Sequence, residues 1–221
     1  MAFSTVFTLA SLLSLTSAHF KVLNPQWRGD SLTLPDASQW TFPCANVSET
    51  PANNRTLWPL TGGSVRINGT HEWALTYVNL GLGTNVSAFN ISLVDGFNQT
   101  GAGIFCLKEA GKAALEEGFK TAGLSMEDVE GMQASVQIIQ ISHSGASLYN
   151  CADITFNATA ALLSDDECAN STGVSGVAIQ NADTPSTTGE PASTESKGAA
   201  TVLKPAIRSG MLAALLAWGL L

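Results

Sequence analysis

Three histidines stand in this chain of 221 residues, and the first of them, His19, occupies a special position. It directly follows Met1–Ala18, an apolar stretch without charged side chains that ends in the small residues Thr16, Ser17 and Ala18. A secretory leader has this pattern, with small residues at the site where signal peptidase cuts. Cleavage after Ala18 would make His19 the first residue of the mature protein, with a free α-amine next to its imidazole ring.

An N-terminal histidine can chelate a metal ion through its amine and its ring Nδ1. A second imidazole placed opposite would complete a set of three nitrogen ligands. Cu(II) favours tetragonal N/O geometry and has the highest affinity in the divalent series. Because a free α-amine has a pKa of about 8, copper displaces its proton at little cost near neutral pH. The sequence therefore predicts one Cu²⁺ per domain, bound by His19.

Two histidines compete for the role of the second imidazole. His71 lies in INGTHEWALTYVNLG, after an Asn68-Gly69 turn and at the start of an expected strand. His143 lies in ISHSGASLYNC, at an expected hairpin tip, where a solvated histidine is the ordinary explanation. We favour His71, although a partly buried ring that is hydrogen-bonded to the backbone would explain His71 without any metal.

A carboxylate is the remaining candidate ligand. Asp153 lies in LYNCADITF, two residues after Cys151, and a disulfide there would fix its position near the rim of the domain. A carboxylate oxygen can complete a copper site and partly neutralise it. The spacing alone does not require this role, since an Asp at the start of a strand is usually a solvated turn residue.

The elements that must position these residues are mostly strands. Phe89, Ile91 and Leu93 alternate with polar residues in 88–94, which is typical of a half-buried strand. Further strands are expected at 63–67, 72–80, 134–142 and 154–157. Helices are expected from Leu107 to about Thr121 and after Ser125, which has Asp128 three residues on as in a capping box. The pattern predicts a mainly β fold, an immunoglobulin-like sandwich of two sheets with a short helical insert.

The C-terminus also carries a processing pattern. Residues 209–221 (SGMLAALLAWGLL) form an apolar tail, and a polar spacer and the small residues around Ser196 and Gly198 precede it. This arrangement is typical of a GPI-anchor signal, with attachment at Gly198 or Ser196. The tail is short for a tail-anchored helix, which is the alternative. We expect a leader at 1–18, a copper-binding domain at 19–169, a Ser/Thr/Pro-rich stalk at 170–198 and a removed propeptide at 199–221.

Cysteines and glycosylation sequons agree with a secreted chain. Four cysteines in a secreted domain favour two disulfides over a thiolate metal site, and of the three possible pairings long-range bridges would best pin both ends of the domain. That argument favours Cys44–Cys151 with Cys106–Cys168. Sequons for N-glycosylation begin at Asn46, Asn54, Asn68, Asn85, Asn90, Asn98, Asn157 and Asn170.

Charge excludes some partners. The formal net charge is −8, and removal of the tail would also remove Lys204 and Arg208. The chain has no basic stripe for nucleic acid, and an anionic surface would repel it, whereas cations are compatible partners. Much of this acidity is explained by solubility alone. We expect a monomer.

Together these features resemble a known family. A leader that ends directly before histidine, the GTHEW and LYNCADITF segments, four cysteines, a stalk and a GPI tail are similar to the fungal X325 or Bim1-like copper acquisition factors, relatives in fold of lytic polysaccharide monooxygenases. The resemblance implies a sandwich with a histidine brace of His19 and His71 and with Asp153 as an additional copper ligand. It also implies copper uptake or homeostasis at the outer face of the plasma membrane or the cell wall, possession of a GPI lipid, delivery to a membrane copper transporter and no polysaccharide cleavage.

Two other functions stay open at this point. A polysaccharide monooxygenase would use the same brace, with Trp27, Trp40, Trp58 and Trp73 as sugar-stacking candidates, although most tryptophans are expected in the core. A bound Asp153 would argue against catalysis, because it would fill a coordination position that an oxidase leaves open. A metal-free GPI-anchored wall glycoprotein would fit the stalk and anchor equally well.

Overall fold

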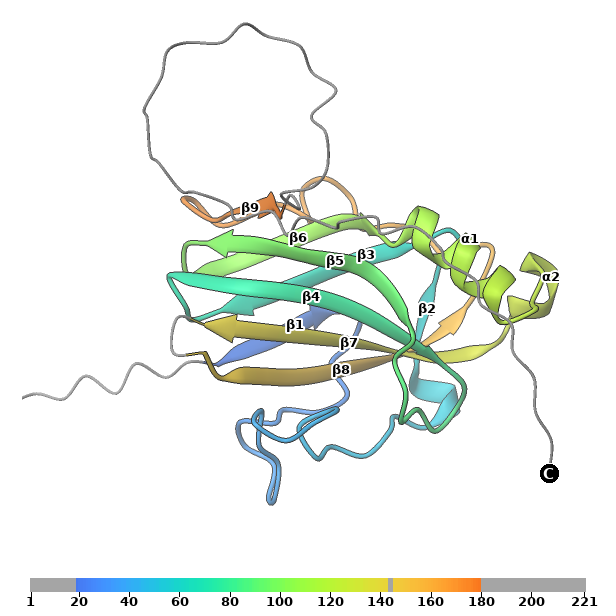
Figure 1. The fold of residues 1–221 in the computed structure, drawn as a ribbon, viewed down its shortest axis with the longest axis horizontal. Coiled ribbons are helices and arrows are strands. Elements are labelled where there is room, and N and C mark those ends of the chain that lie inside the picture. Colours follow the sequence, from blue (N-terminus) through green and yellow to red (C-terminus); the bar gives the residue numbers. More distant parts are fainter. Residues whose placement is uncertain (1–18, 143–144, 180–221) are drawn as a thin grey trace, which may run out of the picture. The chain divides into compact units, whose positions relative to one another are not determined.

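The computed structural model describes residues 19–142 and 145–179. They form two β-sheets packed face to face, with two short helices at one end (Figure 1). The smaller sheet has the order β1-β3-β6, made of Phe20–Asn24, Gly63–Gly69 and Gly103–Ala110. The larger sheet has the order β2-β8-β7-β4-β5-β9, made of Thr56–Trp58, Ser147–Phe156, Gln133–Ser142, Trp73–Leu82, Ile91–Thr100 and Ser175–Ala178. The predicted two-sheet, mainly β fold is confirmed.

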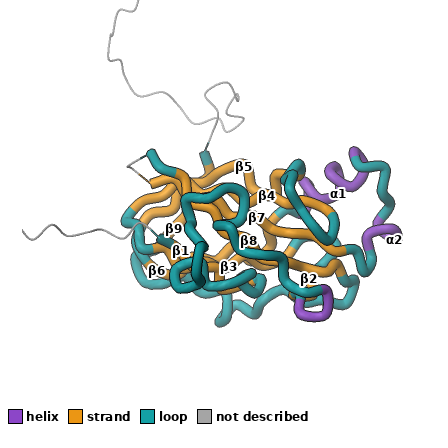
Figure 2. Tube along the Cα trace, turned by 90° about the horizontal axis from the view of Figure 1, so that it is seen from below, coloured by secondary structure: helices purple, strands orange, loops and turns teal. Residues whose placement is uncertain are grey.

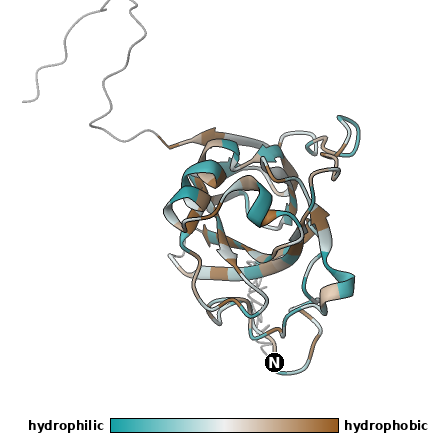
Figure 3. Ribbon diagram, turned by 90° about the vertical axis from the view of Figure 1, so that its right-hand side faces the viewer, coloured by the Kyte–Doolittle hydropathy of each residue, from teal (hydrophilic) through white to brown (hydrophobic). Residues whose placement is uncertain are grey.

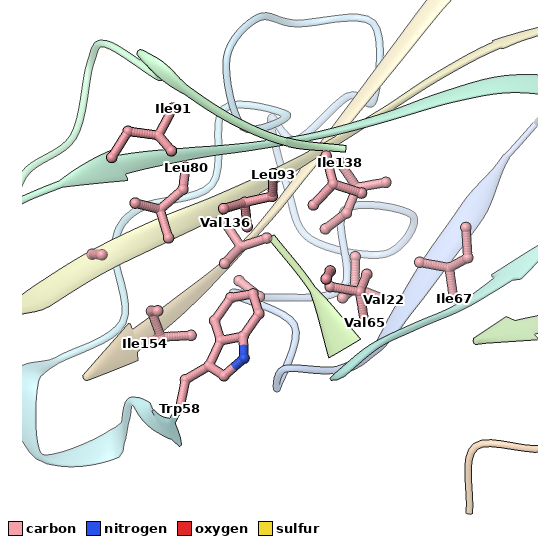
Figure 4. Packing of buried hydrophobic residues seen from close by; sticks show 14 of the residues in the cluster. Val22, Trp58, Val65, Ile67, Leu80, Ile91, Leu93, Val136, Ile138 and Ile154 are labelled. Carbon is pink, nitrogen blue, oxygen red and sulfur yellow. The ribbon is translucent and has the colours of Figure 1, made fainter. Parts of the chain in front are cut away.

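The core lies between the two sheets. Figure 4 shows Val22, Val65 and Ile67 of the smaller sheet opposite aliphatic residues of the larger one. Trp58 is 3% exposed and lies over Gly63, where any Cβ would collide with the indole ring. This close approach explains the glycine at the start of β3. The alternation predicted for 88–94 is also seen, since Ile91 and Leu93 are buried and Ser92 is exposed.

The helical insert begins later than predicted. Residues 107–110 belong to β6, where Leu107 pairs with Val65 of β3, so the prediction of a helix from Leu107 is wrong. Gly111, with φ +90°, ends the strand, and α1 (Lys112–Thr121) follows it. The second helix, α2 (Met126–Val129), has the predicted capping box, in which Ser125 and Asp128 each accept a backbone N–H of the other. The only other helical segment within the described ranges is a 3-10 turn, η1 (Ala52–Asn54).

The register of the strands defines two ends of the sandwich. At one end, here called the histidine end, β1 and β4 begin and β3, β5 and β7 terminate (Figure 1). Helices α1 and α2 lie at the opposite end, as the colouring of Figure 2 also shows. The helices bury Leu115, Phe119 and Val129, and Figure 3 shows hydrophilic as well as hydrophobic residues along them. Within the described part of the chain, no helix is both long and apolar enough to cross a membrane.

Both predicted disulfides are present. Cys44 joins Cys151 of β8, and Cys106 of β6 joins Cys168, so each bridge ties a loop to a different sheet. The second bridge holds the segment that continues into β9, which pairs with β5. The predicted domain boundary at residue 169 is therefore too early, because residues of the expected stalk form a strand of the larger sheet. The remainder of the stalk, Ser196, Gly198 and the apolar tail lie outside the described residues.

The sequons differ in exposure. Asn46, Asn54, Asn85, Asn90 and Asn170 are exposed, whereas Asn68, Asn98 and Asn157 are half-buried. The Asn98 Oδ1 is buried and has no hydrogen-bond partner among the described residues. Glycosylation therefore remains a prediction, and the exposed sequons are the ones that a glycan can occupy without a change in packing.

Candidate metal centre

The pairing of β1 with β3 brings His19 next to the segment that carries His71. Phe20 is opposite Gly69, so the antiparallel register places His19 opposite Thr70. The Thr70 N–H donates to the His19 carbonyl at 3.0 Å, and the Thr70 hydroxyl donates to the same oxygen at 2.8 Å. The His19 nitrogen in turn donates to Thr70 Oγ1 at 3.0 Å. His71 is the next residue, so the register brings two histidines that are far apart in sequence to the same end of the sandwich.

His71 lies in the connection between β3 and β4 and is 7% exposed. A hydrogen bond fixes this connection to the turn between β5 and β6, where the Gly101 N–H donates to the Glu72 carbonyl at 2.8 Å. A buried histidine on a braced connection has a restricted ring position. This restriction suits a metal ligand, whose donor atom must be held in place.

Buried amides form a polar floor beneath this region. A Cβ on Gly69 would lie 3.2 Å from Gln99 Nε2 and 3.4 Å from Gln140 Oε1. Gln140 Nε2 donates to Thr76 Oγ1 at 3.2 Å and to Gln99 Oε1 at 3.0 Å. The strand ends that carry the histidines therefore pack on polar side chains of β4, β5 and β7, and Gly69 leaves room for them. Sequence reasoning missed these residues, because glutamines inside a strand pattern do not reveal which face they occupy.

Asp153 does not join the two histidines. It lies on β8 opposite Ser135 of β7, whereas the end of β7 at Ser142 is level with Ala74, near His71. At about 3.3 Å per residue, Asp153 is about 23 Å along the sheet from that level. The predicted three-residue set of His19, His71 and Asp153 is therefore not assembled by this fold.

Asp153 instead forms a buried ion pair with Arg28. The Arg28 Nη2 lies 2.7 Å from Oδ1, and its Nε donates to Oδ2 at 3.0 Å. Ser135 Oγ donates to Oδ1 at 2.6 Å, and the Thr50 N–H donates to Oδ2 at 2.7 Å. Both carboxylate oxygens are thus committed, and the side chain has an exposed fraction of 0%.

The environment of Asp153 also fixes its charge. Burial would raise its pKa, but the hydrogen bonds from Arg28, Ser135 and Thr50, together with the charge of Arg28, hold the pKa below the ordinary value. The carboxylate therefore stays ionised as the counter-charge of Arg28. This is a structural role, and it depends on a partner that lies far away in the sequence.

The other histidine, His143, lies outside the described residues. Its neighbour Ser142 ends β7 opposite Ala74, three residues after His71. Among residues 19–142 and 145–179, no group of three or more His, Cys, Asp or Glu side chains is placed to hold a metal ion. The described site thus offers two histidine side chains, and the nitrogen of His19 would become an amine after cleavage.

The four tryptophans in the described part of the chain divide into two classes. Trp58 is a core residue, and the half-buried Trp27 packs against the core and donates from Nε1 to Asn150 Oδ1 at 3.1 Å. Trp40 is 51% exposed and Trp73 is 37% exposed. Trp73 is two residues from His71, and Trp40 follows Gln39, which is hydrogen-bonded to Phe20. The expectation that most tryptophans are core residues thus holds for two of them, and the other two lie near the histidine end.

Comparison with known proteins shows the family to which the chain belongs. The model of the "Copper acquisition factor BIM1-like" domain matches residues 17–173. The "Lytic polysaccharide monooxygenase-like protein ham-7" of Neurospora crassa is 34% identical, covering 78% of this chain and 80% of the relative. The "Lytic polysaccharide monooxygenase-like protein X325" of Hypocrea jecorina is 31% identical over 78% of this chain and 79% of its own length. The matched region includes His19, His71 and every strand except β9, and the chain belongs to the BIM1-like copper acquisition factor family.

Proposed function

We propose that this protein binds one copper ion at the histidine end, through the amine and ring of His19 and the ring of His71. The observation that carries the proposal is the pairing of His19 with Thr70, the residue directly before His71. The amine exists only after the leader is removed. Membership of the copper acquisition family supports copper as the metal.

The donor chemistry fits Cu(II). Two imidazoles and an amine supply three nitrogen ligands, which suit a tetragonal copper site, and binding would release the amine proton. An amine at position 19 can keep one N–H on Thr70 Oγ1 and still have its lone pair for a metal. Asp153 is left out of the proposed ligand set, because its oxygens are committed to Arg28, Ser135 and Thr50.

We propose copper acquisition or homeostasis at the cell surface as the role. The secretory leader, the GPI pattern and the family support a chain anchored to the outer face of the plasma membrane that passes copper to a membrane transporter. We also propose that the protein does not cleave polysaccharides. Asp153 no longer supports this part of the proposal, because it is not placed to coordinate the copper. The family description supports it, and so do the exposed sequons, because N-glycans there would impede docking on a polymer.

Oxidative cleavage of a polysaccharide is the second candidate. Exposed Trp40 and Trp73 near the histidine end favour it, since indole faces stack on sugars. Mass spectrometry of the products from chitin, cellulose and xylan, with copper and a reductant, separates the two functions. Copper acquisition predicts no oxidised oligosaccharides, and their release would establish the second candidate.

Copper binding is tested by thermal or urea unfolding of the mature protein with and without Cu²⁺. A ligand at 1,000 times its Kd stabilises the fold by about 4 kcal/mol, and we expect a shift of this size for the wild type. His71→Ala should lose most of the shift, whereas His143→Ala should keep it. Equal loss in the two variants would contradict the assignment of His71, and no shift in the wild type would favour a metal-free wall glycoprotein.

A further inference from the structure

We infer that Gln39 is a positioning residue for the copper site, because its side-chain amide clamps the peptide that follows His19. The inference rests on the proposed function, since it concerns the same ligand residue. Gln39 lies in the long loop between β1 and η1 and is 1% exposed. Its side chain points inward to β1, while the next residue, Trp40, is exposed.

The clamp acts on the open edge of the smaller sheet. β1 is an edge strand that pairs only with β3 among the described strands. Because His19 and Thr70 form a hydrogen-bonded pair, the alternation of an antiparallel ladder directs the backbone polar groups of the next residue, Phe20, away from β3. Its N–H donates to Gln39 Oε1 at 3.1 Å, and its carbonyl accepts from Gln39 Nε2 at 2.8 Å. The amide therefore takes the place of a neighbouring strand for one residue, directly after His19.

Gln39 is itself held in place by the larger sheet. Its backbone carbonyl accepts from the Tyr149 N–H of β8 at 2.7 Å, and its Nε2 also donates to Ser31 Oγ at 3.1 Å. Asn150 of β8 donates to the same Phe20 carbonyl at 3.1 Å and accepts from Ser31 at 2.8 Å. The Cys44–Cys151 disulfide ties the loop to the same strand. The first strand is thus connected to the larger sheet through a buried and satisfied polar network.

Such a clamp matters because the ligand would be the first residue of the mature chain. Terminal residues fray unless they are tied down, and the backbone of His19 is hydrogen-bonded to Thr70 on one side and continues into the Phe20 peptide on the other. Fixing the Phe20 peptide restricts rotation of the backbone that carries the amine and the ring. Residues that orient metal ligands typically contribute 10–100-fold to metal affinity, and we assign an effect of about this size to Gln39.

The test compares Gln39→Met with Gln137→Met. Gln137 is a matched control because it is also a 1% exposed amide that holds the same loop, donating to the Pro43 carbonyl at 2.9 Å, but it has no hydrogen bond to β1. Three quantities are measured on the mature proteins: the unfolding free energy without metal, the hydrogen exchange of the Phe20 amide without metal, and the Cu(II) affinity and electron paramagnetic resonance spectrum.

We expect both variants to be less stable, but only Gln39→Met to speed exchange at Phe20, to change the copper spectrum and to weaken Cu(II) binding by about 10–100-fold. If the spectrum and affinity of Gln39→Met follow those of Gln137→Met, the inference is overturned. If Gln39→Met does not fold, Ser31→Ala takes its place, because it removes one hydrogen-bond partner of the Gln39 amide. The same three quantities are compared with those of Gln137→Met, and we expect smaller changes in the same direction. A wild type that binds no copper would instead refute the proposed function.

Discussion

At the scale of single residues, His71 and Asp153 are both buried and polar, yet the fold gives them different partners. The position of His71 just before a strand could be predicted from sequence, but the expected Asn68-Gly69 turn is wrong, because both residues belong to β3 and pair with β1. The place of Asp153 could not be predicted, because its position along β8 sets it far from the histidine end. Its partner Arg28 is 125 residues away in the chain, and nothing in the local sequence announces the pair.

Replacement of Asp153 by Asn tests this structural role. It should destabilise the fold by about 3–5 kcal/mol, because the buried Arg28 would lose the carboxylate 2.7 Å from its Nη2 and keep only Glu49, 3.8 Å from its Nη1, as a counter-charge. It should leave the Cu(II) spectrum unchanged. Urea unfolding and electron paramagnetic resonance measure the two quantities. A variant of wild-type stability with an altered copper spectrum would restore Asp153 as a ligand.

The contribution of Asp153 also depends on pH. Because its pKa in the folded protein is lowered, the stabilisation is present above the unfolded value of about 3.9 and is lost as the pH falls through the lower folded value. The difference in unfolding free energy between wild type and Asp153→Asn should stay constant from about pH 7 to pH 5 and shrink below about pH 4. A difference that disappears already near neutral pH would contradict the ion pair.

At the scale of elements, the segment from Cys168 to β9 is the feature that sequence reasoning misjudged. Its residues are small and polar, as in a stalk, and β9 gains its order from the ladder with β5 rather than from its own propensity. The capping box of α2 was predictable because its signal is local. Residues 107–110 look helical, but their pairing with β3 overrides that local preference.

Gly176→Val tests whether β9 is part of the domain. A Cβ at Gly176 would lie 2.5 Å from Phe105 Cζ and 3.1 Å from Phe97 Cδ2, so valine should push β9 away from its site. We expect a loss of about 1–3 kcal/mol and faster proteolysis after residue 170, measured by unfolding and limited digestion. Val177→Thr, at a residue that is 62% exposed, is the control. Equal digestion of the two variants would mean that β9 does not hold the segment.

At the scale of the whole molecule, the expected processing at both ends connects fold and function. Removal of the leader would create the amine at the histidine end, and the GPI signal would retain the domain at the cell surface. The sandwich itself was predictable from alternation, turns and disulfide logic. Its register was not, because pairing such as that of His19 with Thr70 depends on contacts between distant segments.

Surface retention has its own test. Phosphatidylinositol-specific phospholipase C should release the protein from intact cells, because the anchor proposed at Gly198 or Ser196 is a lipid. Release is followed by immunoblotting of the supernatant. A Gly198→Val, Ser196→Val double variant should be retained less at the surface, whereas protein that resists the lipase would contradict the anchor.

The central claim is that His19, once it is the first residue of the mature chain, binds Cu(II) through both its α-amine and its imidazole ring. It is tested most directly by titrating Cu(II) into two preparations, one that starts at His19 and one that keeps Ala18, while recording affinity and the electron paramagnetic resonance spectrum. The account predicts tight binding with three nitrogen ligands only for the chain that starts at His19. Identical affinities and spectra for the two chains would contradict it.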